Sequence, residues 1–216
     1  MNADTTPGAA TAGGLVSRAR RELSRDGHPD AAFFAAVLGK SLALGDLART
    51  GLASAQLLDV LAAVFPDAND SGDPTLGELR QQIARCVDDA RPTPVHQAFM
   101  AQTQALLDAY SAPHATTPWV TRILIHACLR TDHLWRDLGL AGREDVTALL
   151  RRHYPGLPER NVQNLRWKKF LAYAARERAG LAPQAAPGCA GCEEEAMCYP
   201  AEAARTKIPI DVIRTR

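Results

Sequence analysis

The chain contains 216 residues, of which 46% are hydrophobic, and it carries a formal net charge of +1 at pH 7. This length is sufficient for a hydrophobic core, and the near-neutral charge argues against a protein whose whole surface attracts nucleic acid or membranes. No run of about 18 apolar residues is present, and the N-terminus lacks the basic start and apolar segment of a secretory signal, so we expect a cytoplasmic protein.

Helical periodicity dominates the chain. Residues 1–14 are small and polar and predict a disordered arm, whereas apolar residues recur at helical spacing through a single domain over residues 15–182. Residues 183–200 form a loop, and residues 201–216 form a tail. The expected helices cover 33–42, 57–65, 75–90, 94–110, 118–130, 143–153 and 159–179. Because strand-like alternation is almost absent, the sequence predicts an all-α fold.

The last of these segments has an apolar stripe with basic residues beside it. The stripe begins at Trp167 and repeats at helical spacing as far as Ala174. Arg166, Lys168 and Lys169 lie on its flanks. We therefore expect a helix that packs through one face and presents positive charge beside it.

The loop at residues 183–200 reads PQAAPGCAGCEEEAMCYP and contains a cysteine motif. Cys189, Cys192 and Cys198 follow the spacing C-x2-C-x5-C, and a glycine between the first two thiols permits a tight turn. Because the loop has few large apolar side chains, we expect a bound metal or cluster to order it. The spacing leaves open zinc, completed by one further His or Cys, and an iron-sulfur cluster.

The other cysteines have a different setting. Cys128 lies among apolar residues at helical spacing, which predicts a buried, inert thiol, and we expect the same of Cys86 in RQQIARCVDDA. The acidic run at residues 193–195 raises thiol pKa values by like-charge repulsion, which argues against a redox sensor with free thiolates. We also find no phosphate-binding glycine loop and no nucleophile with an identifiable base, so we do not expect an enzyme.

Three blocks of sequence together resemble the NifQ family of nitrogen-fixation proteins. They are ACLRTDHLWRDLGL (127–140), NLRWKKFLAY (164–173) and APGCAGCEEEAMC (186–198), and they occur in the order of that family. Upstream of Thr121 we find little resemblance. The resemblance implies a cytoplasmic protein, not an enzyme, that holds an iron-sulfur cluster of the 3Fe-4S or 4Fe-4S type and also binds molybdenum. Its implied partners are molybdate or a molybdenum-sulfur species and the assembly proteins of the nitrogenase iron-molybdenum cofactor.

The chain departs from the family pattern at one cysteine. By this resemblance, the cysteines of NifQ proteins follow the spacing C-x4-C-x2-C-x5-C. In this chain Gln184 occupies the position of the first cysteine. A glutamine amide oxygen is a poor substitute for a soft thiolate on iron. The cluster could keep a vacant corner for another metal, bind more weakly, or take a fourth ligand from elsewhere. His133 is the first candidate for that ligand, because imidazole replaces thiolate in some clusters; a locally hydrogen-bonded histidine at a helix cap is the alternative.

A basic segment precedes the cysteine motif. Residues 151–178 contain eight Lys or Arg and two Glu. Arg166, Lys168 and Lys169 are the best candidates to contact a cluster or an oxoanion, although a solvated helix face is the simpler interpretation for any one of them. The same segment supports an alternative function, a structural-zinc helical protein that acts as an interaction or nucleic-acid-binding module. Against nucleic acid, the sequence shows no zinc-finger His pair and no aromatic stacking arrangement.

Overall fold

The computed structural model describes residue 14 and residues 27–66, 74–85 and 93–200. These residues form helices and no strand, which confirms the all-α prediction. The α-helices are α2 (Ala31–Ala43), α3 (Ser54–Val64), α4 (Pro74–Ala84), α5 (Pro94–Ala109), α6 (Thr117–Cys128), α7 (Leu134–Asp137), α8 (Arg143–His153), α9 (Trp167–Arg178) and α10 (Glu195–Cys198). The 3-10 helices are η1 (Leu47–Thr50), η3 (Pro158–Arg160) and η4 (Pro187–Cys189).

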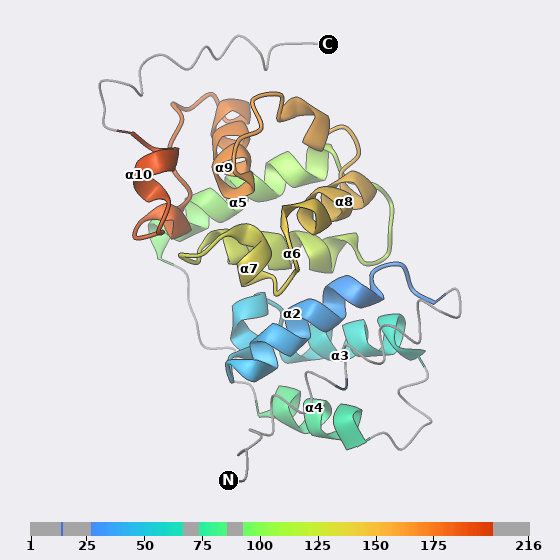
Figure 1. Cartoon of the computed structure of the whole chain (residues 1–216). Helices are drawn as coiled ribbons and strands as arrows, with labels where there is room; N and C mark the ends of the chain where they lie inside the picture. The colour runs from blue at the N-terminus through green and yellow to red at the C-terminus, as the bar shows by residue number, and fades with distance from the viewer. Residues whose placement is uncertain (1–13, 15–26, 67–73, 86–92, 201–216) are drawn as a thin grey trace.

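Two groups of helices make up the described part of the chain (Figure 1). The first group contains α2, α3 and α4, and the second contains α5 to α9, with α10 beside it. The short helix η1 contacts both α2 and α6, so it joins the two groups. Arg49 of η1 donates a hydrogen bond to the backbone oxygen of Asp137 at a distance of 3.2 Å, which ties the first group to the end of α7. Among the described residues, every helix is too short or too polar to cross a lipid bilayer.

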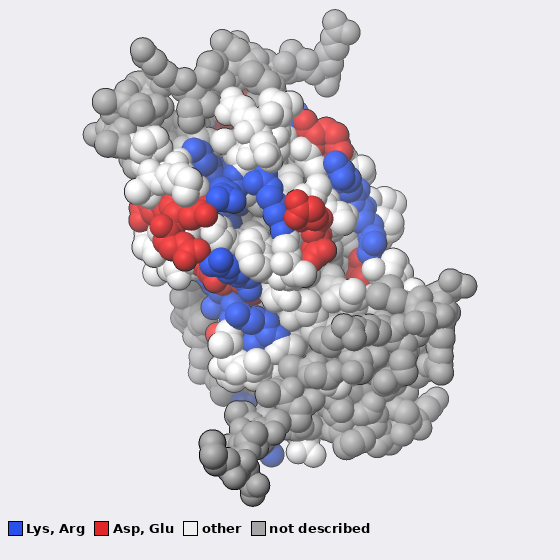
Figure 2. All heavy atoms as spheres, in the orientation of Figure 1, with Lys and Arg blue, Asp and Glu red and all other residues white. Residues whose placement is uncertain are grey.

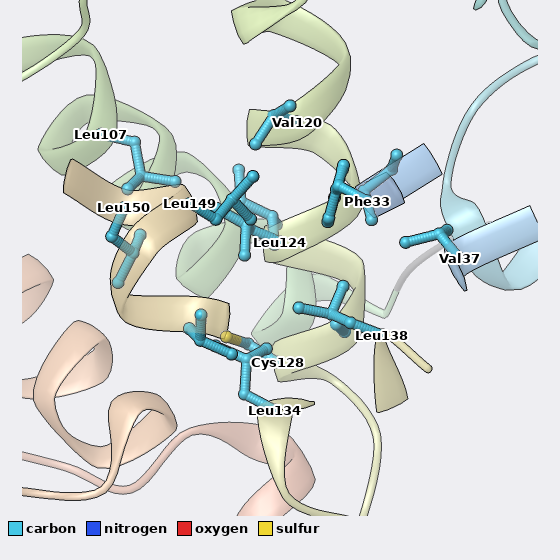
Figure 3. Packing of buried hydrophobic residues seen from close by; sticks show 14 of the residues in the cluster. Phe33, Val37, Leu107, Val120, Leu124, Cys128, Leu134, Leu138, Leu149 and Leu150 are labelled. Atoms are coloured by element: carbon cyan, nitrogen blue, oxygen red, sulfur yellow. The ribbon is translucent and has the colours of Figure 1, made fainter. Parts of the chain in front are cut away.

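The core between these helices is apolar and includes the thiols of Cys128 and Cys189. Figure 3 shows Cys128 close to Leu134 and Leu138, and its side chain is fully buried. Burial raises the pKa of the Cys128 thiol to about 12, so the thiol stays protonated at neutral pH. The prediction of a buried thiol is therefore confirmed for Cys128. Cys86 and the predicted tail lie outside the described residues, as does almost all of the predicted arm.

The predicted helix over residues 159–179 is wrong in its first half. Only the short η3 occurs there, and α9 begins at Trp167. The side chain of Asn161 accepts from the backbone N–H of Leu165 at 2.8 Å and donates to the Leu165 carbonyl at 2.9 Å. Asn164 then takes a left-handed backbone conformation with φ of 52°. These local bonds replace the first helical turns, because an asparagine side chain competes with the backbone for its own hydrogen bonds.

Candidate metal centre

One cavity lies where the cysteine loop, residues 183–200, meets α7, α8 and α9. The loop contributes Gly188, Cys189, Cys192 and Cys198 to its wall. The rest of the wall consists of Asp132, His133, Leu134, Trp135, Arg143, Arg166, Trp167, Lys168 and Lys169. Every residue that the sequence predicted for the site therefore lines the same cavity, although the segments come from three separate blocks.

A series of backbone turns shapes the part of the loop that carries the thiols. The Cys192 N–H donates to the carbonyl of Cys189 at 3.2 Å, and the Glu195 N–H donates to the carbonyl of Cys192 at 3.0 Å. Gly191 has a φ of 78°, a conformation that residues with a Cβ rarely adopt. Its N–H donates to the Glu195 carboxylate at 2.8 Å. The tight turn that the sequence predicts between the first two thiols is confirmed.

Gly188 brings the loop into direct contact with the backbone at the end of α6. A Cβ at this position would lie 1.8 Å from the carbonyl oxygen of Arg130. No side chain can occupy that space without displacing the loop. The glycine therefore sets how closely Cys189, the next residue, approaches the helical body.

The three thiols have different surroundings. Cys189 is buried, and the Tyr199 hydroxyl donates to its sulfur at 3.6 Å. Burial raises the pKa of the Cys198 thiol, although the positive charges of Lys169 and Arg166 oppose that shift. Cys189, Cys192 and Cys198 share the cavity wall, but among the described residues no three His, Cys, Asp or Glu side chains lie close enough to hold one metal ion.

Lys168 and Lys169 are buried, whereas the sequence places them on the exposed flanks of the helix. The Lys168 ammonium donates to the Asp137 carboxylate at 2.6 Å and to the Arg130 carbonyl at 2.7 Å. The Lys169 ammonium donates to the Cys198 carbonyl at 2.5 Å. The first lysine thus anchors α9 to α6 and α7, and the second anchors α9 to the cysteine loop.

Aromatic rings enclose the Lys169 ammonium. It lies 5.4 Å from the centre of the Tyr173 ring and 5.0 Å from the centre of the Tyr199 ring, within range of cation–π attraction. Burial lowers the pKa of Lys169, and the nearby thiols Cys198 and Cys189 oppose that shift. A buried positive charge therefore lies beside two of the three thiols.

Two glutamates of the loop, Glu193 and Glu194, face the cations around the cavity; we call them the acidic pair. Glu193 Oε1 lies 2.7 Å from Arg136 Nη1, and Glu194 Oε2 lies 2.5 Å from Arg166 Nη2. His133 Nε2 lies 3.5 Å and 3.7 Å from these two carboxylate oxygens. Figure 2 shows acidic and basic side chains in contact on this side of the molecule.

Comparison with known proteins identifies the family. The NifQ family model matches residues 32–200. The chain belongs to the NifQ family. It is 32% identical to "Protein NifQ" of Azotobacter vinelandii over 152 residues, and this alignment covers 70% of this chain and 77% of that protein. It is 34% identical to "Protein NifQ homolog" of Sinorhizobium fredii over 173 residues, and this alignment covers 77% of this chain and 70% of that protein. No solved structure matches this chain.

The NifQ match extends further than the three blocks. Upstream of Thr121 the sequence by itself shows little resemblance, but the family model begins at residue 32, close to the start of α2. The first group of helices is therefore part of the family fold. The match ends at residue 200, the last residue of the cysteine loop.

Gln184, at the position of the missing NifQ cysteine, is exposed and does not line the cavity. His133 does line it, and its ring stacks on Trp135 with a centroid distance of 6.4 Å. It is also the N-cap residue of α7, but its side chain makes no cap hydrogen bond, so the structure supports only the position of the helix-cap alternative. Ligation by His133 stays a prediction, because its Nε2 faces the acidic pair in this structure.

Several residues of the site carry no signal in the sequence that identifies them as site residues. Arg143 lines the cavity and lies over the Trp167 ring at 5.6 Å, and Tyr199 bonds to Cys189. The Trp167 indole is identified in the sequence only as part of the apolar stripe. For Gly188 the signal is the Pro-Gly pair before the first cysteine, which marks a turn but does not reveal the close contact with α6.

Proposed function

We infer that this chain holds an iron-sulfur cluster on Cys189, Cys192 and Cys198 and supplies molybdenum for assembly of the nitrogenase iron-molybdenum cofactor. One observation carries the proposal: the three thiols line one cavity together with side chains from the other two NifQ blocks. The protein acts as a donor and not as a catalyst of substrate turnover. Its partners are the proteins that assemble the cofactor.

The residues around the cavity fit such a cluster. Three thiolates are soft ligands that suit iron, and a cluster bound to them is anionic. Lys169 and Arg166 place positive charge beside the thiols, which offsets that negative charge. The Tyr199 hydroxyl donates to Cys189, the kind of contact that orients a ligand and tunes a metal centre. When bound, the cluster would supply iron and sulfide sites to which molybdenum can attach.

Arg166 and Lys169 remain the proposed contacts to a cluster or to molybdate. Lys168 is a weaker candidate, because two of its three N–H donors already bond to Asp137 and to the Arg130 carbonyl. Gln184 is exposed and outside the cavity, so His133 is the proposed fourth ligand. The acidic pair would have to move away from His133 before the ring could bind metal.

Structural zinc is the second candidate, because three Cys and one His around one cavity are also a zinc donor set. These side chains would have to move closer together than they lie here to hold a single ion. Metal analysis separates the two candidates. The full-length chain should be purified without oxygen and assayed for iron, acid-labile sulfide, molybdenum and zinc. We expect iron and sulfide in similar amounts, a brown colour, and loss of both in a variant with all three loop cysteines changed to Ser.

A Cys128→Ser variant is the matched control, since this buried thiol lies outside the cavity. It should keep its iron. Stoichiometric zinc without sulfide would contradict the donor function. Iron-free protein after anaerobic reconstitution would contradict it as well.

A further inference from the structure

A buried hydrogen-bond donor in the cavity wall has no acceptor. Trp167 is 7% exposed, and its Nε1–H has no hydrogen-bond partner in the described part of the chain. Its ring is fixed by an edge contact with Phe170 at 5.8 Å and by the Arg143 guanidinium above it. Native structures rarely leave a buried N–H unpaired, because an unsatisfied donor costs free energy. An acceptor from outside the described chain would satisfy it.

Most of the charged side chains in the wall of this cavity are positive, and Asp132 is the one carboxylate among its described lining residues. Arg143, Arg166 and Lys169 line the same cavity as Trp167. All of their N–H groups are donors and none can accept. The missing acceptor is therefore expected to be an anion with several oxygen or sulfur atoms, since one such group can accept from a guanidinium and an indole at once.

The chain already places an anion of its own against Arg166, one of the cations of the cavity wall. Glu194 Oε2 lies 2.5 Å from Arg166 Nη2, but it is buried and has no well-directed hydrogen bond among the described residues. The contact is thus a close ion pair without the directed geometry of a strong Arg–carboxylate bond. The side chain of Arg166 is 46% exposed and that of Glu194 is 23% exposed, so an anion from solvent can reach the pair.

We propose that this cavity binds a tetrahedral oxoanion, and that the oxoanion displaces Glu194 from Arg166 and accepts the hydrogen bond of Trp167 Nε1. A dianion replaces a single carboxylate charge, which favours the exchange in a cationic cavity. Glu194 lies between Cys192 and Cys198 in the chain, so its release frees the turn that carries these two thiols. The inference rests on the proposed function only for the choice of molybdate as the biological oxoanion.

Calorimetric titration of the full-length protein with sodium molybdate tests the site. It should be done on the anaerobically purified protein and again after metal removal. We expect Glu194→Gln to tighten molybdate binding about tenfold, because it removes the competing charge. Arg166→Gln should weaken binding at least about tenfold, and Trp167→Phe, which keeps the ring packing, should weaken it roughly threefold to tenfold.

Exposed residues outside the cavity supply matched controls. Arg151 and Glu159 form an ion pair at 3.5 Å with both side chains more than half exposed, and neither lines the cavity. Arg151→Gln and Glu159→Gln change the net charge by the same amounts as the test variants and should leave the affinity unchanged. Equal affinities of Glu194→Gln and Glu159→Gln, or of Arg166→Gln and Arg151→Gln, would overturn the proposal.

Titrations with tungstate, sulfate and phosphate identify the source of the oxoanion. Preference for molybdate and tungstate supports molybdenum uptake at this site. Equal affinity for sulfate supports the oxoanion site and contradicts its assignment to molybdenum. Metal analysis of the same preparations separates the two proposals: iron-loaded protein without anion binding contradicts this inference alone, and iron-free protein with the expected variant pattern contradicts the cluster alone.

Discussion

Gly188 shows how much a single residue can determine in this site. It allows the backbone of the cysteine loop to touch the backbone at the end of α6, where a Cβ would lie 1.8 Å from the Arg130 carbonyl oxygen. That carbonyl also accepts a hydrogen bond from Lys168 at 2.7 Å, so it is fixed in place. The loop, and not the helix, has to move if the glycine is replaced.

We therefore predict that Gly188→Ala loosens the loop from the body of the protein. Overpacking of this kind typically costs about 1 to 3 kcal/mol, and we expect the free energy of unfolding in urea to fall by that amount. The loop should also become sensitive to limited proteolysis, and reconstituted iron should decrease. These measurements need no activity assay.

Gly191→Ala is the matched control for this variant. Gly191 has a positive φ, but no atom lies within 4 Å of the position that its Cβ would occupy. The strain should cost only about 1 kcal/mol and leave the contact of the loop with α6 unchanged. If Gly188→Ala is no more sensitive to proteolysis than Gly191→Ala, the contact with Arg130 does not hold the loop.

A buried carboxylate joins three helices of the fold at the start of α2. Asp30 is 2% exposed and accepts from Thr116 at 2.6 Å, from Arg152 at 2.7 Å and from His153 at 3.1 Å. Burial by itself raises the pKa of Asp30, but the hydrogen bonds from His153, Thr116 and Arg152 outweigh it and lower the pKa well below its usual range. The carboxylate therefore stays ionised and links α2 to the ends of α6 and α8.

Asp30→Asn should be strongly destabilising, because it leaves the buried His153 and its neighbours without a negative partner. We expect a loss of about 3 kcal/mol in the free energy of unfolding, measured by urea denaturation. The exposed pair of Glu159 with Arg151 is the control, and Glu159→Gln should change stability by less than about 0.5 kcal/mol. A loss below about 1 kcal/mol for Asp30→Asn would show that the network does not hold these helices together.

Helices are predictable from this sequence where the apolar residues that become buried recur at helical spacing along one face. The ranges predicted for α5, α6 and α8 agree with the structure within two residues, because their buried side chains repeat at the helical period. The prediction fails before α9, where Asn161 closes a local ring of hydrogen bonds with Leu165. Periodicity does not report such competition, since the apolar residues continue on both sides of it.

The members of the site are predictable from sequence, but their surroundings are not. The thiols and basic residues are identified by motif and resemblance, and all of them line the cavity. The burial of Lys168 depends on Asp137, a tertiary partner that no spacing reveals. Likewise, Asp30 is the N-cap residue of α2, yet its side chain makes no cap bond and instead binds Thr116, just before α6, and His153 of α8.

The two groups of helices meet at a contact between Gly51, which follows η1, and His126 of α6. A Cβ on Gly51 would lie 2.2 Å from the His126 ring, so the chain passes directly over the imidazole. His126 Nε2 is buried and has no hydrogen-bond partner in the described part of the chain. Burial, together with the charges of Arg122 and Arg130, lowers the pKa of His126 to about 4.

A fall in pH should therefore lower the free energy of unfolding of the whole protein through this contact. The unfolded chain binds a proton at His126 near pH 6.5, whereas the folded chain binds it only near pH 4. The contribution of neutral His126 to the free energy of unfolding is fully present above pH 6.5 and is lost as the pH falls from 6.5 to 4. We expect this loss to be about 2 kcal/mol after allowance for the partial exposure of the ring. His126→Leu removes the titrating group, so its free energy of unfolding should change less over this interval than that of the unaltered protein.

Urea denaturation of both proteins at pH 4, 5.5 and 7 measures this difference. The pKa of His28 is also lowered by burial, but His28 is present in both proteins and cancels in the comparison. The Asp30 carboxyl stays ionised throughout the interval because its pKa is far below the usual range. Parallel pH profiles for the two proteins would mean that the joint between the helix groups does not depend on a neutral His126.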